Sequence, residues 1–112
     1  DDNPEGVTAH VEWTSARPNW AEGAVAAAGQ AEAMRELLAA IARGAELLGL
    51  RHGTEFRYGT SDANFLAEGG AATVDGMGPV GFHDHTADEY ILTETLFERV
   101  RLTALVLWQL SR

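Results

Sequence analysis

Residues 58–91 read YGTSDANFLAEGGAATVDGMGPVGFHDHTADEYI, and this stretch determines how the rest of the chain is arranged. Its second half is a glycine-rich run followed by a histidine pair, His83 and His85. Glycine lets a backbone bend sharply and approach a bound group closely. A histidine flanked by carboxylates is a common beginning of a metal or acid–base site. The stretch is therefore the first candidate for a functional site, with a strand and a long helix predicted before it and one helix after it.

The composition limits the chain to one domain and excludes several classes of function. The 112 residues, of which 46% are hydrophobic, can form a single core. A formal net charge of −9 disfavours nucleic acids and anionic membranes as partners. The sequence holds no apolar run of the roughly 18 residues that a membrane span needs, and no secretory signal. Cysteine is absent, which excludes disulfides and thiolate zinc sites. The compartment stays open, with the cytoplasm favoured over the periplasm.

The segments before the central stretch predict a strand, a long helix and a second strand. Residues 6–14 alternate apolar and polar side chains, the pattern of a half-buried strand, and Pro18 ends it. Residues 21–48 are rich in alanine and carry apolar side chains at three-to-four spacing, which predicts a helix. Gly49 is the expected stop of that helix. Residues 50–58 then predict a short strand.

The central stretch and the C-terminus predict two more helices. Ser61 is a predicted N-cap for a short helix over residues 62–68. Residues 71–74 predict a short buried strand, and residues 75–88 have no periodicity and predict a loop. A threonine is expected to cap the final helix, with a glutamate at capping-box spacing; the residues concerned are Thr93, Thr95 and Glu98.

This order of elements predicts an α/β fold with a mostly parallel sheet and flanking helices. Ligands of such sheets bind at the carboxyl ends of the strands. Residues 59–62 and 75–85 both follow predicted strands. We therefore expect the two loops to face one crevice.

The run Gly76-Met-Gly-Pro-Val-Gly81 matches the glycine spacing of a dinucleotide-binding loop. In such a loop the pattern opens a helix, whose N-terminus holds the pyrophosphate. Here Pro79 and the histidine pair follow, and no helix is predicted before Thr93. We interpret the run as a tight loop that reverses the chain.

His85 is the strongest candidate for a metal ligand. A neutral imidazole binds zinc well when its other nitrogen is held by an acceptor, and Asp84, Asp88 or Glu89 could supply one. Zinc needs at least three protein ligands, and the sequence offers no obvious set. The alternative is a surface histidine in a loop.

Two further features suit a bound anion, and each has a simpler alternative. The turn of Gly59, Thr60 and Ser61 offers backbone N–H groups and hydroxyls for an anion or oxyanion, although a plain helix cap explains it as well. Arg17, before Pro18, could pair with a carboxylate through two hydrogen bonds. The alternative for Arg17 is a solvated side chain at the end of a strand.

Taken in order, these segments resemble the C-terminal part of the co-catalytic zinc amidohydrolases. This is the family of glutamate carboxypeptidase, acetylornithine deacetylase and succinyl-diaminopimelate desuccinylase, and the glutamate carboxypeptidase branch is the most similar. The resemblance runs from about Gly6 to Arg112. The motifs that carry it are Arg17-Pro18, Leu47-Leu-Gly-Leu50, Gly59-Thr-Ser-Asp62, Val74-Asp-Gly-Met-Gly-Pro-Val-Gly81 and His85-Thr-Ala-Asp-Glu-Tyr90.

The resemblance implies an aminopeptidase-like catalytic domain that carries an inserted lid domain. Residues 1–17 would be the end of the lid, or dimerisation, domain and a linker, and residues 18–112 the second part of the catalytic domain. His85 would be a zinc ligand, with His83 only its neighbour. Arg17 would hold the substrate's free carboxylate, and Gly59, Thr60 and Ser61 would line the substrate pocket. The implied partners are a small peptide or N-acyl amino acid, the N-terminal part of the same domain, and a second copy bound through the lid.

The activity implied is hydrolysis of an amide bond by a carboxypeptidase or deacylase, with release of a C-terminal glutamate as one option. Two zinc ions would polarise the carbonyl and bind hydroxide, and a glutamate would act as general base. The family's H-x-D motif, bridging aspartate, Glu-Glu pair and lid histidine are not found in these 112 residues. The chain also begins at Asp1 and not at methionine, which indicates part of a longer protein. We expect the chain to be inactive alone. The alternative is a non-catalytic α/β module or partner subunit.

Overall fold

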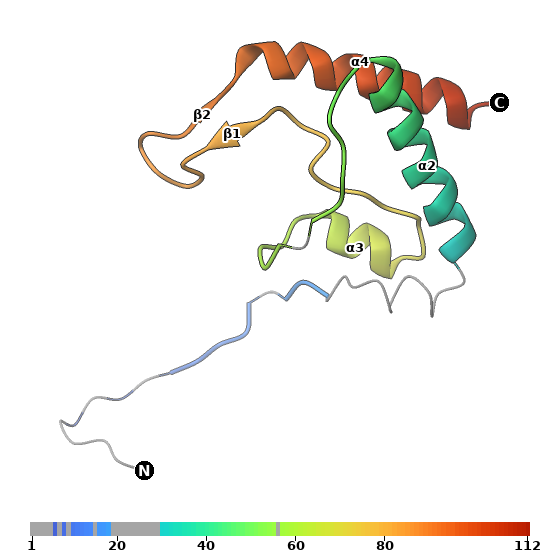
Figure 1. Ribbon diagram of the computed structural model, residues 1–112. Coiled ribbons are helices and arrows are strands. Elements are labelled where there is room, and N and C mark those ends of the chain that lie inside the picture. Colours follow the sequence, from blue (N-terminus) through green and yellow to red (C-terminus); the bar gives the residue numbers. More distant parts are fainter. Residues whose placement is uncertain (1–5, 7, 9, 15, 19–29, 56) are drawn as a thin grey trace.

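The computed structural model describes residues 6, 8, 10–14, 16–18, 30–55 and 57–112. Its elements follow the chain in the order α2 (Ala31–Leu47), α3 (Ala63–Glu68), β1 (Gly81–Phe82), β2 (Tyr90–Ile91) and α4 (Thr93–Leu110). Helix α2 meets the C-terminal part of α4, the two strands lie at the N-terminal end of α4, and α3 lies apart from the helix pair (Figure 1).

The core of the described chain lies between α2 and α4. It consists of Ala40 and Ala45 from α2 and Leu102 and Val106 from α4. Leu102 is the largest fully buried side chain, at 1% exposure. A methyl group built on Gly44 would lie 3.0 Å from Cδ1 of Leu102. The small residues of α2 thus let the two helices approach closely enough to bury Leu102.

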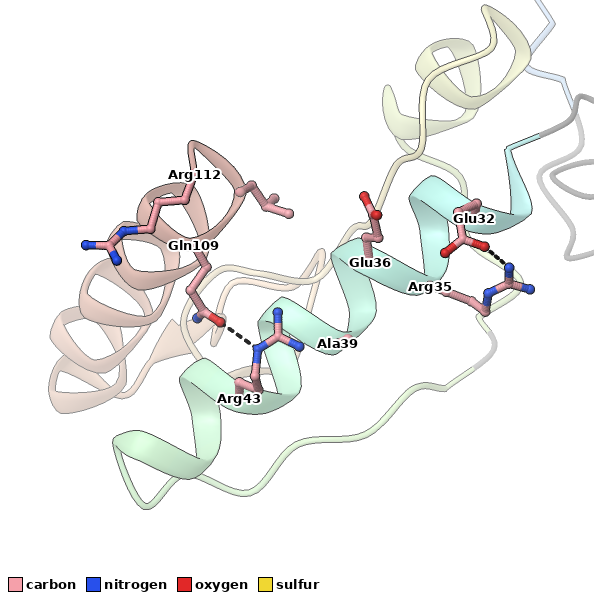
Figure 2. Close-up of a pocket in the computed structure, with 8 residues that line it drawn as sticks. Glu32, Arg35, Glu36, Ala39, Arg43, Gln109 and Arg112 are labelled. Carbon is pink, nitrogen blue, oxygen red and sulfur yellow. Dashed lines mark hydrogen bonds and ion pairs between the residues drawn. The ribbon is translucent and has the colours of Figure 1, made fainter.

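Polar bonds join the same two helices beside this core. Arg43 donates from Nε to Oε1 of Gln109 at 2.9 Å, and Gln109 donates from Nε2 to the carbonyl oxygen of Ala40 at 3.2 Å. Figure 2 shows these side chains in an open hollow, where Arg35 of α2 pairs with Glu32 of the same helix. Four of the side chains that line the hollow therefore already bind one another in pairs.

The two strands form a short hairpin attached to the start of α4. They are antiparallel, with Gly81 opposite Ile91 and Phe82 opposite Tyr90. The N–H of Val80 donates to Oγ1 of Thr95 at 2.9 Å. This bond fixes the hairpin to the first turn of α4.

The prediction of a mostly parallel sheet is wrong. Within the described residues, the sheet has two antiparallel strands of two residues each. The described parts of residues 6–14 and 50–58, and all of residues 71–74, form no strand, and Trp13 is 86% exposed. An alternating pattern marks a face that could be buried, but a strand also needs neighbouring backbone to accept its hydrogen bonds.

The helix predictions fare better than the strand predictions. The predicted helix over 21–48 is confirmed as α2 from Ala31, while residues 19–29 lie outside the described part. Gly49 follows α2 with a φ of +66°, as a helix stop requires. The predicted short helix is confirmed as α3 and the final helix as α4.

The predicted threonine cap of α4 is wrong. Leu92 occupies the cap position, and no side chain caps the helix. The hydroxyl of Thr95 instead donates to the carbonyl oxygen of Leu92 at 2.6 Å and accepts from Val80. Thr95 therefore lies within the first turn of α4, and its hydroxyl binds Val80, beside β1, and Leu92, just before the helix.

One face of α4 carries apolar side chains that the described chain does not cover. Phe97, Val100 and Leu107 are each more than 60% exposed. An apolar groove runs between α4 and the loop residues Met77 to Pro79. None of the described helices is long and apolar enough to span a membrane.

Candidate functional site

His83 and His85 lie in the turn that joins β1 to β2. Both have left-handed backbone, with φ of 60° and 64°, a conformation that costs a non-glycine residue about 1–3 kcal/mol. Thr86 stabilises the turn, because its N–H and its hydroxyl both donate to the carbonyl oxygen of His83, at 3.2 and 2.7 Å. Strained backbone of this kind clusters at functional sites.

The two imidazoles have different surroundings. The ring of His83 lies 5.9 Å from the ring of Tyr90, while His85 is exposed. Within the described part of the chain, His85 makes no hydrogen bond to Asp84, Asp88 or Glu89. The predicted acceptor for its second nitrogen is therefore not engaged.

The described residues do not fit a zinc ion on their own. Zinc needs at least three protein ligands, and no three histidine or carboxylate side chains are grouped to hold a metal in the part of the chain that is described. A metal at His85 would need further ligands from outside these residues.

Arg17 lies against the start of α3. Its Nη2 is 3.1 Å from Oδ1 of Asp62, and its Cζ is 5.8 Å from the ring centroid of Phe65. Carboxylate and aromatic ring both attract a guanidinium. The cation predicted to hold a substrate carboxylate is therefore paired with a carboxylate of its own chain.

The turn over residues 59–61 is closed by local hydrogen bonds. The N–H of Ser61 donates to Oδ1 of Asn64 at 3.0 Å, and the N–H of Ala63 donates to Oγ of Ser61 at 3.2 Å. These two N–H groups are therefore not available to an anion. Gly59 and Thr60, at the start of the turn, are exposed.

Asn64 is the residue of this site that sequence reasoning missed. It is buried, at 7% exposure, and its Nδ2 donates to the carbonyl oxygen of Pro18 at 2.9 Å. The signal was available, since Ser61-Asp-Ala-Asn64 has the reciprocal spacing of a capping box, with asparagine in place of glutamate or glutamine.

Asp75 brings the glycine-rich loop to the same turn. A hydrogen bond from the Ser61 side chain, and a second from the N–H of Gly76 at 2.7 Å, lower the pKa of the Asp75 carboxyl. The start of the predicted loop over residues 75–85 therefore lies beside Ser61. The predicted crevice between the two loops stays a prediction.

The histidine turn approaches a different segment. The bond that Arg57 donates from Nε to Oε1 of Glu55, at 2.7 Å, raises the pKa of Arg57, and Asp84 adds a smaller effect of the same sign. Asp84 thus lies within electrostatic reach of Arg57. The structure brings Arg17, Ser61 and Asp75 into one cluster and places His85 on a separate turn. None of these four residues lines either hollow beside α4.

No family model, curated protein or solved structure matches this chain.

Proposed function

We propose that this chain is the C-terminal segment of a zinc-dependent metallohydrolase that cleaves an amide bond of a peptide or N-acyl amino acid. The observation that carries the proposal is the position of Arg17. Its guanidinium lies 3.1 Å from a carboxylate oxygen of Asp62, directly after the turn of residues 59–61. An arginine that binds a carboxylate there suits the role of gripping a substrate's free carboxylate.

In this proposal the chain supplies a substrate-binding arginine, part of the pocket wall and one metal ligand. Arg17 binds the substrate carboxylate, and the turn over residues 59–61 forms the wall beside it. His85 presents an imidazole nitrogen from an exposed turn. Because the described residues do not complete a zinc site, the other ligands and the general base belong to polypeptide outside them.

The uncovered apolar face of α4 supports the proposal that this chain packs against further polypeptide. Leu107 is 63% exposed, and such apolar patches mark interaction surfaces. Nε of Arg99, beside the apolar groove, is shielded from solvent and has no hydrogen-bond partner within the described chain. A buried donor of this kind is normally satisfied, so an acceptor from additional polypeptide fits this position.

Metal content and turnover test the proposal in the full-length gene product that contains this segment. We expect two zinc ions per chain by plasma mass spectrometry and hydrolysis of N-acyl amino acids. His85→Ala should lose one zinc ion and nearly all turnover, because zinc loses a ligand. His83→Ala is the matched control, and it should keep both ions.

An unchanged zinc content in the His85→Ala protein would show that His85 is not a ligand. A wild-type protein without zinc or turnover would contradict the proposal as a whole. The carboxylate-binding cluster around Arg17 would then favour the alternative of a non-catalytic binding module.

A further inference from the structure

Asn64 joins two parts of the chain that are 46 residues apart in sequence. Its side-chain oxygen accepts from the N–H of Ser61, and its side-chain nitrogen donates to the carbonyl oxygen of Pro18. The side chain is buried while it makes both bonds. A buried amide satisfied at both ends fixes the geometry of the groups that it joins.

The bond to Pro18 determines where Arg17 lies. A proline has a fixed φ and restricts the residue before it to extended backbone. A fixed carbonyl at Pro18 therefore leaves Arg17 little backbone freedom. Its guanidinium is accordingly directed to the start of α3, where Asp62 and Phe65 lie.

Asp62 holds the guanidinium weakly. The side chains of Arg17 and Asp62 are 44% and 89% exposed, and an ion pair of such exposure contributes about 0–1 kcal/mol. A ligand carboxylate that has other contacts to the protein can replace Asp62. The ring of Phe65 can stay against the guanidinium during that exchange.

From these contacts we infer that Asn64 is the positioning residue of a carboxylate site, and that Asp62 occupies Arg17 until a ligand carboxylate displaces it. The ligand class, a peptide or acyl amino acid with a free carboxylate, rests on the proposed function. The two roles predict opposite effects of substitution.

Isothermal titration calorimetry of the full-length protein with N-acetyl-L-glutamate tests both roles. The α-amide of the same compound, which lacks the α-carboxylate, is the control ligand. Asn64→Asp keeps the acceptor for Ser61 and loses the donor to Pro18, but it also adds a negative charge that repels the acid. The uncharged Asn64→Leu loses the same donor, and in both variants the acid should bind about three- to tenfold more weakly; a loss in Asn64→Asp alone would be an effect of charge and would overturn the positioning role. Asp62→Asn removes the competing charge, so the acid should bind about two- to fivefold more tightly. Binding of the amide should change in none of these variants.

Three further measurements keep the outcomes distinct. Arg17→Ala should remove the preference for acid over amide, whereas Arg35→Ala, on α2, should retain it. Circular dichroism should show that Asn64→Asp remains folded, and an equal loss of acid and amide binding would reveal general damage and overturn the positioning role. Three other results would overturn the inference. They are an unchanged affinity for the acid in Asn64→Asp, a lower affinity for the acid in Asp62→Asn, and equal affinities for acid and amide in the wild-type protein.

Zinc content separates this inference from the proposed function. A protein that binds zinc and hydrolyses its substrate, but is insensitive to Asn64→Asp, would contradict only the inference. A protein without zinc, whose acid binding still responds to Asn64 and Asp62 as expected, would contradict only the proposed function.

Discussion

The helix pair and the site-bearing loops of this chain differ in what holds them in place. Helices α2 and α4 bury Leu102 against Gly44 and Ala45. Residues 57–92 instead depend on hydrogen bonds made by single side chains, such as those of Asn64, Thr86 and Thr95. The candidate site lies almost entirely in the second region.

The residues that stabilise the fold and the residues that carry the functional motifs therefore lie in different regions. The helix pair has an ordinary sequence and most of the buried apolar contacts. The loops hold most of the motifs on which the family resemblance rests, and they have left-handed backbone at His83 and His85. Elements with few buried contacts open at a lower free energy than the core, so the two regions should respond differently to substitution.

The largest effect should come from the centre of the helix pair. Leu102→Ala should lower the free energy of unfolding of the chain by about 2–5 kcal/mol, because it leaves a cavity between α2 and α4. Leu107→Ala, on the exposed face of the same helix, should change it by less than about 0.5 kcal/mol. Urea unfolding followed by circular dichroism measures both. Equal losses in the two variants would show that the core is not where we place it.

An intermediate effect of opposite sign should come from the histidine turn. His85→Gly relieves a left-handed backbone and should raise the free energy of unfolding by up to about 1 kcal/mol. Asp84→Gly, at a neighbour outside the left-handed region, should lower it by about 0.5–1 kcal/mol. If both glycine variants lost stability alike, the turn would carry no stored strain.

The smallest effect should appear at Asp75 as a function of pH. Its folded pKa lies below the ordinary value of 3.8, chiefly through the Ser61 hydrogen bond. The stability that this bond contributes is present above the unfolded pKa and is lost as pH falls through the folded one. Ser61→Ala should move the Asp75 pKa back toward 3.8, as measured by carboxyl NMR titration, whereas Thr60→Val should leave it unchanged. An unshifted pKa in Ser61→Ala would remove Ser61 as the cause.

Sequence reasoning predicted the helices well because their signals are local. Spacing of apolar residues predicts α2 and α4, the capping character of Ser61 predicts α3, and Gly49 stops α2 as expected. The parallel sheet could not be predicted in this way, since an alternating pattern does not specify a neighbouring strand. The hairpin of two-residue strands was missed because it depends on pairing across the seven-residue turn over residues 83–89, which has no periodicity of its own.

The candidate site was predicted unevenly. The order of motifs along the chain predicted Arg17 and the turn over residues 59–61 as site residues. Arg17 contacts Asp62, directly after that turn, and the role of both stays a prediction. The function of His85 stays a prediction, because its proposed metal needs ligands from outside the described residues. Asn64 was overlooked although its spacing from Ser61 fits a capping box, and its long-range bond to Pro18 has no signal in the sequence.

That bond also has a consequence for the order in which the chain folds. Closing a flexible loop of 46 residues costs about 3 kcal/mol from the logarithmic length term alone, whereas one net hydrogen bond returns only about 1 kcal/mol. The contact between Asn64 and Pro18 therefore cannot nucleate folding. It forms after the intervening chain has become compact, so recognition of a carboxylate by Arg17 should be among the last properties that a newly made chain acquires.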